Sequence, residues 1–147
     1  MTQEEKELLL KDLCARLPYE VKCLVNFDDG TKEIMTLKTG LPNSFGRWDF
    51  YNENCSGCSN NFKPYLRPMS SMTEEEREEL SDYLCEQVMS NKIGITIPPN
   101  PTQGKGIPFI WMGDCMEWLN AHHFDYRGLI EKGLAIAVTE ENNPYYK

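Results

Sequence analysis

The chain has little of what nucleic-acid binding and membrane insertion require. Its 147 residues include 15 Lys and Arg against 23 Asp and Glu, a net charge of −8. This deficit of cations argues against direct nucleic-acid binding, which needs clustered Lys and Arg against phosphate. No apolar run approaches ~18 residues, so we expect no membrane-spanning segment. The acidic start, residues 1–6, is unlike a secretory signal peptide.

Familiar catalytic motifs are missing as well. Gly104-Lys105-Gly106 lacks the upstream Gly and the following Ser or Thr of a phosphate-binding loop. No Gly-x-Ser-x-Gly motif occurs. The two histidines, His122 and His123, are adjacent rather than at the His-x-x-x-His spacing of metalloproteases. The sequence therefore favours a protein that is not an enzyme, although catalytic groups can converge from distant positions.

Secretory disulfides are not expected either. A chain of this length can build a core without them, and four of its six cysteines lie among apolar residues of predicted helices or strands. We interpret these four (Cys14, Cys23, Cys85 and Cys115) as reduced, small core residues. A reducing, cytoplasmic setting follows as the expected localisation.

What the chain does have is enough apolar material for a core. Hydrophobic residues make up 40% and aromatic residues 11% of the sequence, which excludes a disordered chain. Neither an internal repeat nor a linker divides it. We therefore expect residues 1–147 to form a single domain, with a mobile C-terminal tail from about residue 140.

The first segment is a predicted amphipathic helix over residues 3–17. Thr2 and Glu5 form a capping box at its start, and Pro18 ends it. Asp12 and Arg16 are four residues apart with the acid first, a spacing that predicts an ion pair on the solvent-facing side.

A β-hairpin is predicted over residues 20–39. Val21, Cys23 and Val25 alternate with polar residues, and Asp28-Asp29-Gly30 favours a chain reversal. The apolar face of this hairpin needs cover. The leucines of the predicted first helix (Leu10, Leu13 and Leu17) are the nearest candidates.

The middle of the chain alternates loops with short extended pieces. Residues 40–61 are rich in Gly, Asn and Ser, with a short strand expected at 47–51. Residues 62–67 are expected to be extended because of flanking prolines. A second capping box, formed by Thr73 and Glu76, predicts a helix to about residue 90.

The last third is less regular. Residues 93–97 alternate as a short strand, and residues 107–111 read as another extended piece. Asp114 with Glu117 forms a third capping box, which predicts a helix over 114–123.

A helical turn and a strand are expected to follow. Residues 125–132 favour the turn, closed by Gly133, and the apolar run 134–138 favours a strand buried on both faces. The whole pattern predicts an α+β fold: a small, mostly antiparallel sheet with about three helices packed on it in one pair of layers.

One local motif could hold a metal. Cys55-Ser56-Gly57-Cys58 has the Cys-x-x-Cys spacing that presents two thiolates to one zinc ion. The remaining ligands would have to come from Cys115, His122 or His123, so half of the site is undefined. The alternative is two loop cysteines near a turn, with no cofactor.

The two histidines also have two interpretations. Neighbouring residues on a helix point about 100° apart, so one helix does not aim both at one metal. The simpler interpretation is one partly buried, hydrogen-bonded His and one exposed His. The functional alternative is an enzyme that uses His122 or His123 as a base.

Charge is concentrated in one segment. Residues 73–90 contain seven acids and one base, a net charge of −6. The acids at 74–79 could imitate a phosphate backbone, as in acidic nucleic-acid mimics. A solvated helix face is the commoner origin of such a run.

Three stretches resemble a known family. They are residues 62–76 (FKPYLRPMSSMTEEE), 118–135 (WLNAHHFDYRGLIEKGLA) and 4–18 (EEKELLLKDLCARLP), which cover about a third of the chain. The resemblance is to small uncharacterised proteins of gut anaerobes, many carried on phage-like or mobile elements. It implies a cytoplasmic and mobile-element origin and assigns no activity, ligand or site residue.

These observations favour a non-catalytic protein-interaction or regulatory module. Its expected partner is an unidentified protein, and a homo-oligomer stays open. The alternatives are a zinc protein using Cys55 and Cys58, an enzyme using His122 or His123, and an acidic nucleic-acid mimic.

Overall fold

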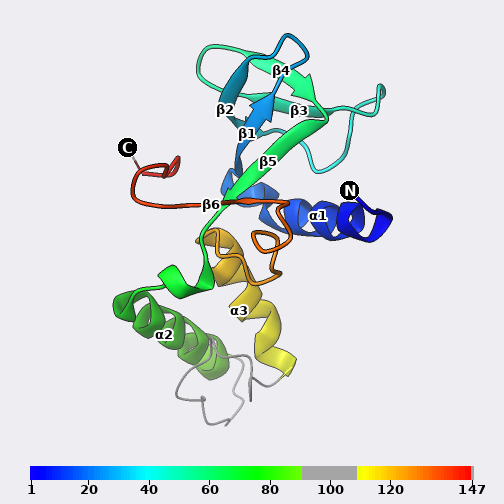
Figure 1. Cartoon of the computed structure of the whole chain (residues 1–147). Helices are drawn as coiled ribbons and strands as arrows, with labels where there is room; N and C mark the ends of the chain where they lie inside the picture. Colours follow the sequence, from blue (N-terminus) through cyan, green and yellow to red (C-terminus); the bar gives the residue numbers. More distant parts are fainter. Residues whose placement is uncertain (91–108, 147) are drawn as a thin grey trace.

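We analysed a computed structural model of the chain, which describes residues 1–90 and 109–146 (Figure 1). The described helices are α1 (Gln3–Arg16), α2 (Glu74–Ser90) and α3 (Phe109–Ala121), with short 3-10 turns η1 (Leu17–Tyr19) and η2 (Met69–Ser71). The described strands are β1 (Lys22–Asn26), β2 (Lys32–Leu37), β3 (Trp48–Tyr51), β4 (Ser56–Ser59), β5 (Asn61–Leu66) and β6 (Ile136–Ala137). The strand expected at 93–97 lies outside the described residues.

The strands form one sheet in the order β4-β3-β2-β1-β5-β6. Every neighbouring pair is antiparallel except β5 and β6, which are parallel. The predicted α+β class with a mostly antiparallel sheet is thereby confirmed. The predicted hairpin is also confirmed, since β1 pairs directly with β2.

Helix α1 covers one face of this sheet, its inner face. The Thr2 side chain accepts from the Glu5 backbone N–H at 3.2 Å, so the predicted capping box is present. Leu9 and Leu13 pack with the buried residues Cys23 and Val25 of β1 and with Val21, which directly precedes it. Leu13 and Leu17 cover the sheet as expected, whereas Leu9, and not Leu10, completes this cluster.

Helices α2 and α3 pack against each other rather than on the sheet (Figure 1). Their shared cluster is built on Leu80, Leu84, Trp118 and Leu119. Within the described side chains of α2, the apolar residues Leu80 and Leu84 pack against α3 rather than against a strand. The expected single pair of layers is therefore divided into a sheet with α1 and a separate helix pair.

A third cluster lies where the chain passes between these two parts. It contains Leu66, Leu129, Leu134 and Ala135. The assignment of residues 1–147 to one domain stays a prediction.

The predicted turn over 125–132 is a series of tight turns. The carboxylate of Asp125 accepts from the backbone N–H groups of Leu129 (2.9 Å) and Ile130 (2.8 Å), and Gly133 has a φ of 68°. The following strand is shorter than the predicted 134–138, because only Ile136–Ala137 pair with β5.

Two element assignments from the sequence are wrong. Helix α3 begins at Phe109, so Asp114 lies inside it and the extended piece expected at 107–111 is helical from residue 109. A four-residue capping pattern is short enough to occur by chance within a helix. Strand β4 falls in a stretch expected to be a loop, where Gly57 and small polar residues give little strand signal.

The sequence pattern also predicts the wrong environment for the Asp12–Arg16 pair. Both side chains are fully buried rather than solvent-facing. Arg16 Nε donates to Asp12 Oδ2 at 2.7 Å, and Arg16 Nη2 donates to the Phe124 carbonyl at 2.7 Å. Arg127 Nε lies 3.2 Å from Asp12 Oδ1. This network links α1 to the segment after α3. Arg16 and Phe124, which it joins, are 108 residues apart in the chain.

The C-terminal segment, residues 139–146, is anchored to the sheet. Asn142 Nδ2 donates to the Ala137 carbonyl at 3.0 Å, and the Tyr145 hydroxyl donates to the Tyr65 carbonyl at 2.8 Å. The mobility expected from about residue 140 stays a prediction, to be weighed against these contacts. No helix within the described ranges has the length and apolarity needed to cross a bilayer.

Candidate functional site

The outer face of the sheet, opposite α1, carries a groove. Side chains alternate along β1 and β2, so that Lys22, Ile34 and Thr36 share the outer face. Tyr51 of β3 lies directly opposite Thr36 and joins them. Ile34 is 46% and Tyr51 39% exposed, so two large apolar groups are left partly open to solvent.

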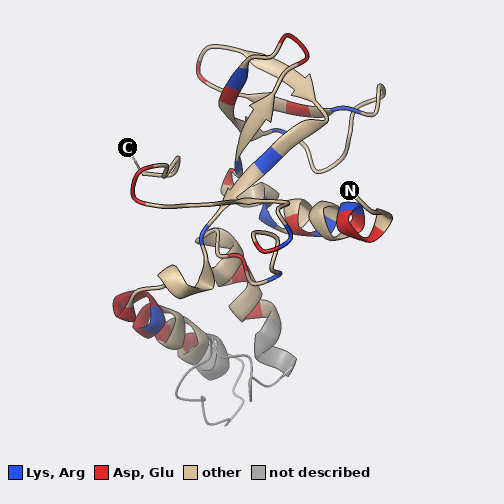
Figure 2. Cartoon of the chain, in the orientation of Figure 1, with Lys and Arg blue, Asp and Glu red and all other residues tan. Residues whose placement is uncertain are grey.

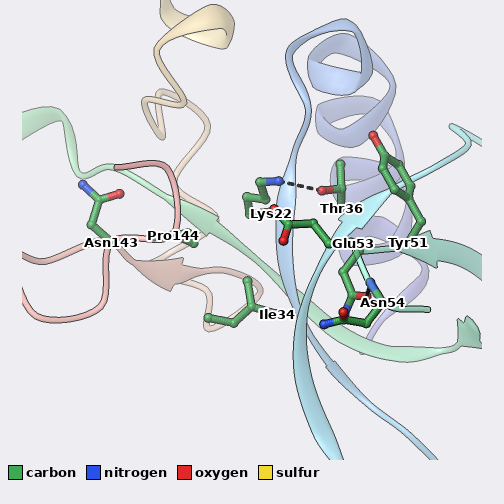
Figure 3. A pocket seen from close by; sticks show the side chains of 9 residues that line it. Lys22, Ile34, Thr36, Tyr51, Glu53, Asn54, Asn143 and Pro144 are labelled. Carbon is green, nitrogen blue, oxygen red and sulfur yellow. Dashed lines mark hydrogen bonds between the residues drawn. The ribbon is translucent and has the colours of Figure 1, made fainter. Parts of the chain in front are cut away.

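The groove has a volume of about 530 Å³. Figure 3 shows Asn143 and Pro144 on one side and Tyr51, Glu53 and Asn54 on the other, with Lys22 and Ile34 between them. Its lining is formed by Lys22, Ile34, Thr36, Tyr51, Asn52, Glu53, Asn54, Asn143 and Pro144. We call this the sheet-face groove.

One wall of the sheet-face groove is a hydrogen-bonded turn. The Asn52 side-chain oxygen accepts from the backbone N–H groups of Asn54 (2.9 Å) and Cys55 (2.8 Å). Its amide nitrogen donates to Glu33 Oε2 at 3.0 Å. This turn holds Glu53 and Asn54 in place at the rim, which lowers the entropy lost when a ligand binds.

Lys22 is the cation of the groove. Its Nζ donates to Thr36 Oγ1 at 2.8 Å (Figure 3). Among the described residues no carboxylate lies within ion-pair distance of Lys22. A charged ammonium with a hydroxyl partner alone retains capacity for a carboxylate from a ligand.

The opposite wall is the C-terminal segment, which separates the sheet-face groove from a second cleft. That cleft has a volume of about 260 Å³ and includes Lys22, His122, His123 and Tyr145 in its lining. Lys22 borders both spaces. The C-terminal segment therefore lies between the sheet-face groove and the second cleft.

His123 closes the C-terminal end of α3 in an unusual conformation. Its φ is 61°, in the left-handed region that glycine favours. Its N–H donates to the Asn120 carbonyl (3.1 Å), and the Phe124 N–H donates to the Leu119 carbonyl (2.9 Å), the pattern of a Schellman motif. A non-glycine residue there costs about 1–2 kcal/mol of backbone energy.

The His123 ring is neutral in the folded protein. Its side chain is buried, with the residue 8% exposed, and burial lowers its pKa to about 3, assisted by the nearby charges of Arg16, His122, Arg67 and Lys22. Its Nδ1 has no hydrogen-bond partner among the described residues. An imidazole with a pKa this low is a weak base at neutral pH.

His122 has a different environment. Its Nδ1 lies 2.9 Å from the Trp118 carbonyl and, because a carbonyl only accepts, carries the proton. The ring stacks on Trp118, and Nε2 lies 3.8 Å from Glu79 Oε1. The expectation of one exposed histidine is wrong, since His122 is half-buried and His123 is buried.

The cysteines of the Cys-x-x-Cys motif are placed on and beside an edge strand. Cys58 lies in β4 and Cys55 directly before it. Cys55 Sγ donates to Glu33 Oε2 at 3.6 Å, and the pKa of Cys55 is raised by partial desolvation and by Glu33. Side chains three apart on an extended strand face opposite sides.

Cys115 lies elsewhere, buried in the α2–α3 cluster, where burial raises its pKa. Within residues 1–90 and 109–146 the structure has no group of three or more His, Cys, Asp or Glu placed to hold a metal. The structure therefore does not bring together Cys55, Cys58, Cys115 and the histidines. A zinc site stays a prediction without geometric support.

The acidic residues of α2 gather near its start (Figure 2). Glu76 is bound by Arg67 through two bonds of 2.6 and 2.8 Å. Partial burial raises the pKa of Glu76, but the bonds from Arg67 and from the Thr73 backbone N–H outweigh it and lower the pKa. One acid of the run is thus used internally, while Glu74 and Glu75 are exposed.

Comparisons with protein-family models, curated proteins and solved structures give no match for this chain. The resemblance to proteins of gut anaerobes and mobile elements therefore stays a prediction.

Sequence reasoning missed the groove residues. Lys22 and Tyr51 carry no motif, and Asn143 and Pro144 lie in a segment expected to be a mobile tail. The signal that could have found them is the strand alternation, since it places Lys22 and Ile34 on the face that α1 does not cover.

Proposed function

We propose that this protein is a non-catalytic binding module that holds an extended peptide segment of a partner protein in the sheet-face groove. The observation that carries the proposal is the open groove of about 530 Å³ on the uncovered face of the sheet. Ile34 and Tyr51 supply partly exposed apolar anchors there. Half-exposed aromatic side chains in a concavity are typical of binding hot spots.

The chemistry of the lining supports a peptide as the ligand. Asn54 and Asn143 each carry an amide, a group that can donate to and accept from the C=O and N–H groups of a peptide backbone. Lys22 adds a cation for an acidic side chain or a chain-terminal carboxylate.

A base-catalysed reaction has less support than binding. His123 is the more enclosed of the two histidines, but its low pKa keeps it a weak base. The Nδ1 of His122 is engaged by the Trp118 carbonyl, which gives that ring a structural role at the end of α3.

The proposal includes a reducing, cytoplasmic setting. All six cysteines are free thiols in the structure. Cys14, Cys55 and Cys85 are exposed, so the core positions predicted for Cys14 and Cys85 are wrong. Exposed free thiols suit a reducing compartment better than an oxidising one. A regulatory role follows if the bound segment belongs to another protein's functional site.

The test is a peptide-display selection on the full-length protein, followed by affinity measurement of the enriched peptides. We expect the Ile34→Glu and Tyr51→Ser variants to weaken these peptides at least ten-fold. The matched control is Phe45→Ser, which removes an aromatic residue that is 87% exposed on the loop between β2 and β3. It should leave affinity unchanged.

Two results would overturn the proposal. One is the absence of any enriched peptide. The other is a set of enriched peptides that bind the Ile34→Glu and Tyr51→Ser variants normally.

A further inference from the structure

Tyr145 fills the place where β1 and β5 part. The pairing of these strands ends at Cys23 and Pro64, and proline has no backbone N–H to continue it. Beyond that point the Tyr145 hydroxyl donates to the Tyr65 carbonyl at 2.8 Å and accepts from the Lys22 N–H at 3.3 Å. One phenol hydroxyl therefore bridges the backbones of two strands that no longer pair.

The ring of Tyr145 packs against an imidazole ring. It stacks on His123 with ring centroids 3.8 Å apart and an interplanar angle of 15°. His123 is 8% exposed, with Nδ1 unpartnered among the described residues, and is held with φ at 61° by the end of α3. Backbone strain that persists beside a cleft is a marker of a functional position.

We call the space that the Tyr145 side chain fills, between Tyr65, Lys22 and His123, the hole. Its contacts favour one type of side chain. A phenol hydroxyl both donates and accepts, so it satisfies the Tyr65 carbonyl and the Lys22 N–H together. Phenylalanine fills the same space but leaves both backbone groups without that partner. The hole is thus chemically selective for tyrosine.

The segment that carries Tyr145 has few other attachments. Asn142 Nδ2 bonds to the Ala137 carbonyl, and Asn143 and Pro144 form a wall of the sheet-face groove. Tyr146, the next residue, is 70% exposed. Lys22 donates its N–H to the Tyr145 hydroxyl and also lines the groove, so the hole lies next to the groove.

We infer that this hole is a tyrosine-binding site, whose ligand is a tyrosine in the extended peptide segment of a partner and which Tyr145 occupies as an internal competitor. The inference rests on the proposed function and adds a ligand class to it. The C-terminal segment is the observed occupant, and it shows which chemistry the hole accepts.

The experiment uses a fluorescently labelled peptide of residues 139–147 (TEENNPYYK) and full-length protein, with binding followed by fluorescence anisotropy. In the Tyr145→Ala variant the hole is empty, so we expect the peptide to bind at least ten-fold more tightly than to the wild-type protein. A peptide with Phe in place of Tyr145 should bind about five- to ten-fold more weakly. The Tyr146→Ala protein is the matched control and should behave as wild type.

Folding of each variant is checked by circular dichroism. If Tyr145→Ala does not fold, Tyr145→Phe replaces it, because the ring remains and only the hydroxyl is lost. That variant should bind the tyrosine peptide about five- to ten-fold more tightly than wild type.

The inference is wrong if the folded variants bind the peptide no better than wild type, or if the Phe peptide binds as well as the Tyr peptide. Its failure is distinct from failure of the proposed function. One distinguishing result is a set of selected peptides that need Ile34 and Tyr51 for binding yet gain no affinity for the Tyr145→Ala variant. That result would support the proposed groove and refute the tyrosine site alone.

Discussion

His123 lies flat against Tyr145, with the two ring centroids 3.8 Å apart. The pair joins the end of α3 to the C-terminal segment, across the cleft next to the sheet-face groove. His123 is buried and Tyr145 is half-buried, and desolvation raises the pKa of Tyr145 as it lowers that of His123. The stack is therefore between two neutral rings at neutral pH.

This neutrality predicts a pH dependence of stability. The pKa of His123 is about 3 in the folded protein and near 6.5 when unfolded, so the unfolded state binds the extra proton between these values. Stability from this residue is complete above pH 6.5 and falls as the pH drops toward 3. The loss should be about 2–3 kcal/mol between pH 6.5 and 4.5.

The measurement is urea unfolding of wild type and of His123→Asn at both pH values. Asn tolerates the left-handed conformation and does not titrate. The difference between the two proteins isolates His123 from carboxylates such as Glu76, which titrate in both. An identical pH dependence in the two proteins would contradict the buried, neutral imidazole.

The positive φ of His123 predicts that glycine is more stabilising than alanine at this position. His123→Gly should be more stable than His123→Ala by about 1 kcal/mol, because alanine resists a φ of 61° and glycine does not. His122 is the matched control: its φ is not positive, so His122→Gly should be less stable than His122→Ala by about 0.5–1 kcal/mol. Thermal unfolding of the four variants measures both differences, and the same sign at both positions would refute the assignment.

The buried network around Asp12 predicts a large loss on removing Arg16. Arg16→Met leaves the Asp12 carboxylate with Arg127 alone and removes the charged donor of the Phe124 carbonyl, which keeps only the Tyr126 N–H. We expect a cost of about 3–5 kcal/mol in the free energy of unfolding. Lys11→Met, an exposed change on the same helix, should stay within about 0.5 kcal/mol. Denaturant unfolding that finds equal costs would show that the network is not a stabilising junction.

The fold was predictable from the sequence where a local pattern and the tertiary environment agree. The alternation of Val21, Cys23 and Val25 predicted the hairpin, and the Thr73–Glu76 capping box predicted the start of α2. Arg16 shows the limit of such patterns. Its spacing from Asp12 is that of a surface pair, and its burial depends on Phe124, far along the chain.

The candidate site was less accessible to sequence reasoning. The sequence marks His123 as a candidate because histidine is rare in the chain, but its conformation depends on how α3 ends. Nothing local in the sequence distinguishes Tyr145 from exposed Tyr146. Their juxtaposition depends on the path of the C-terminal segment across the sheet, which no periodicity encodes.

The placement of the Cys-x-x-Cys motif predicts weak metal affinity. Cys55 and Cys58 lie at and beside an edge strand, without a third ligand among the described residues. Protein purified without chelator should contain less than about a tenth of an equivalent of zinc, and added zinc should not raise its melting temperature. Stoichiometric zinc that is lost in a Cys55→Ser, Cys58→Ser variant would contradict this and restore the zinc alternative.

The central claim is that the uncovered face of the sheet binds a peptide. Amide chemical-shift mapping with a display-selected peptide on the isotope-labelled, full-length protein tests it most directly. The account predicts that the largest shift changes fall on Lys22, Ile34, Tyr51 and Asn143, on opposite sides of one groove. Changes confined to the acidic start of α2, with those four residues unmoved, would contradict it.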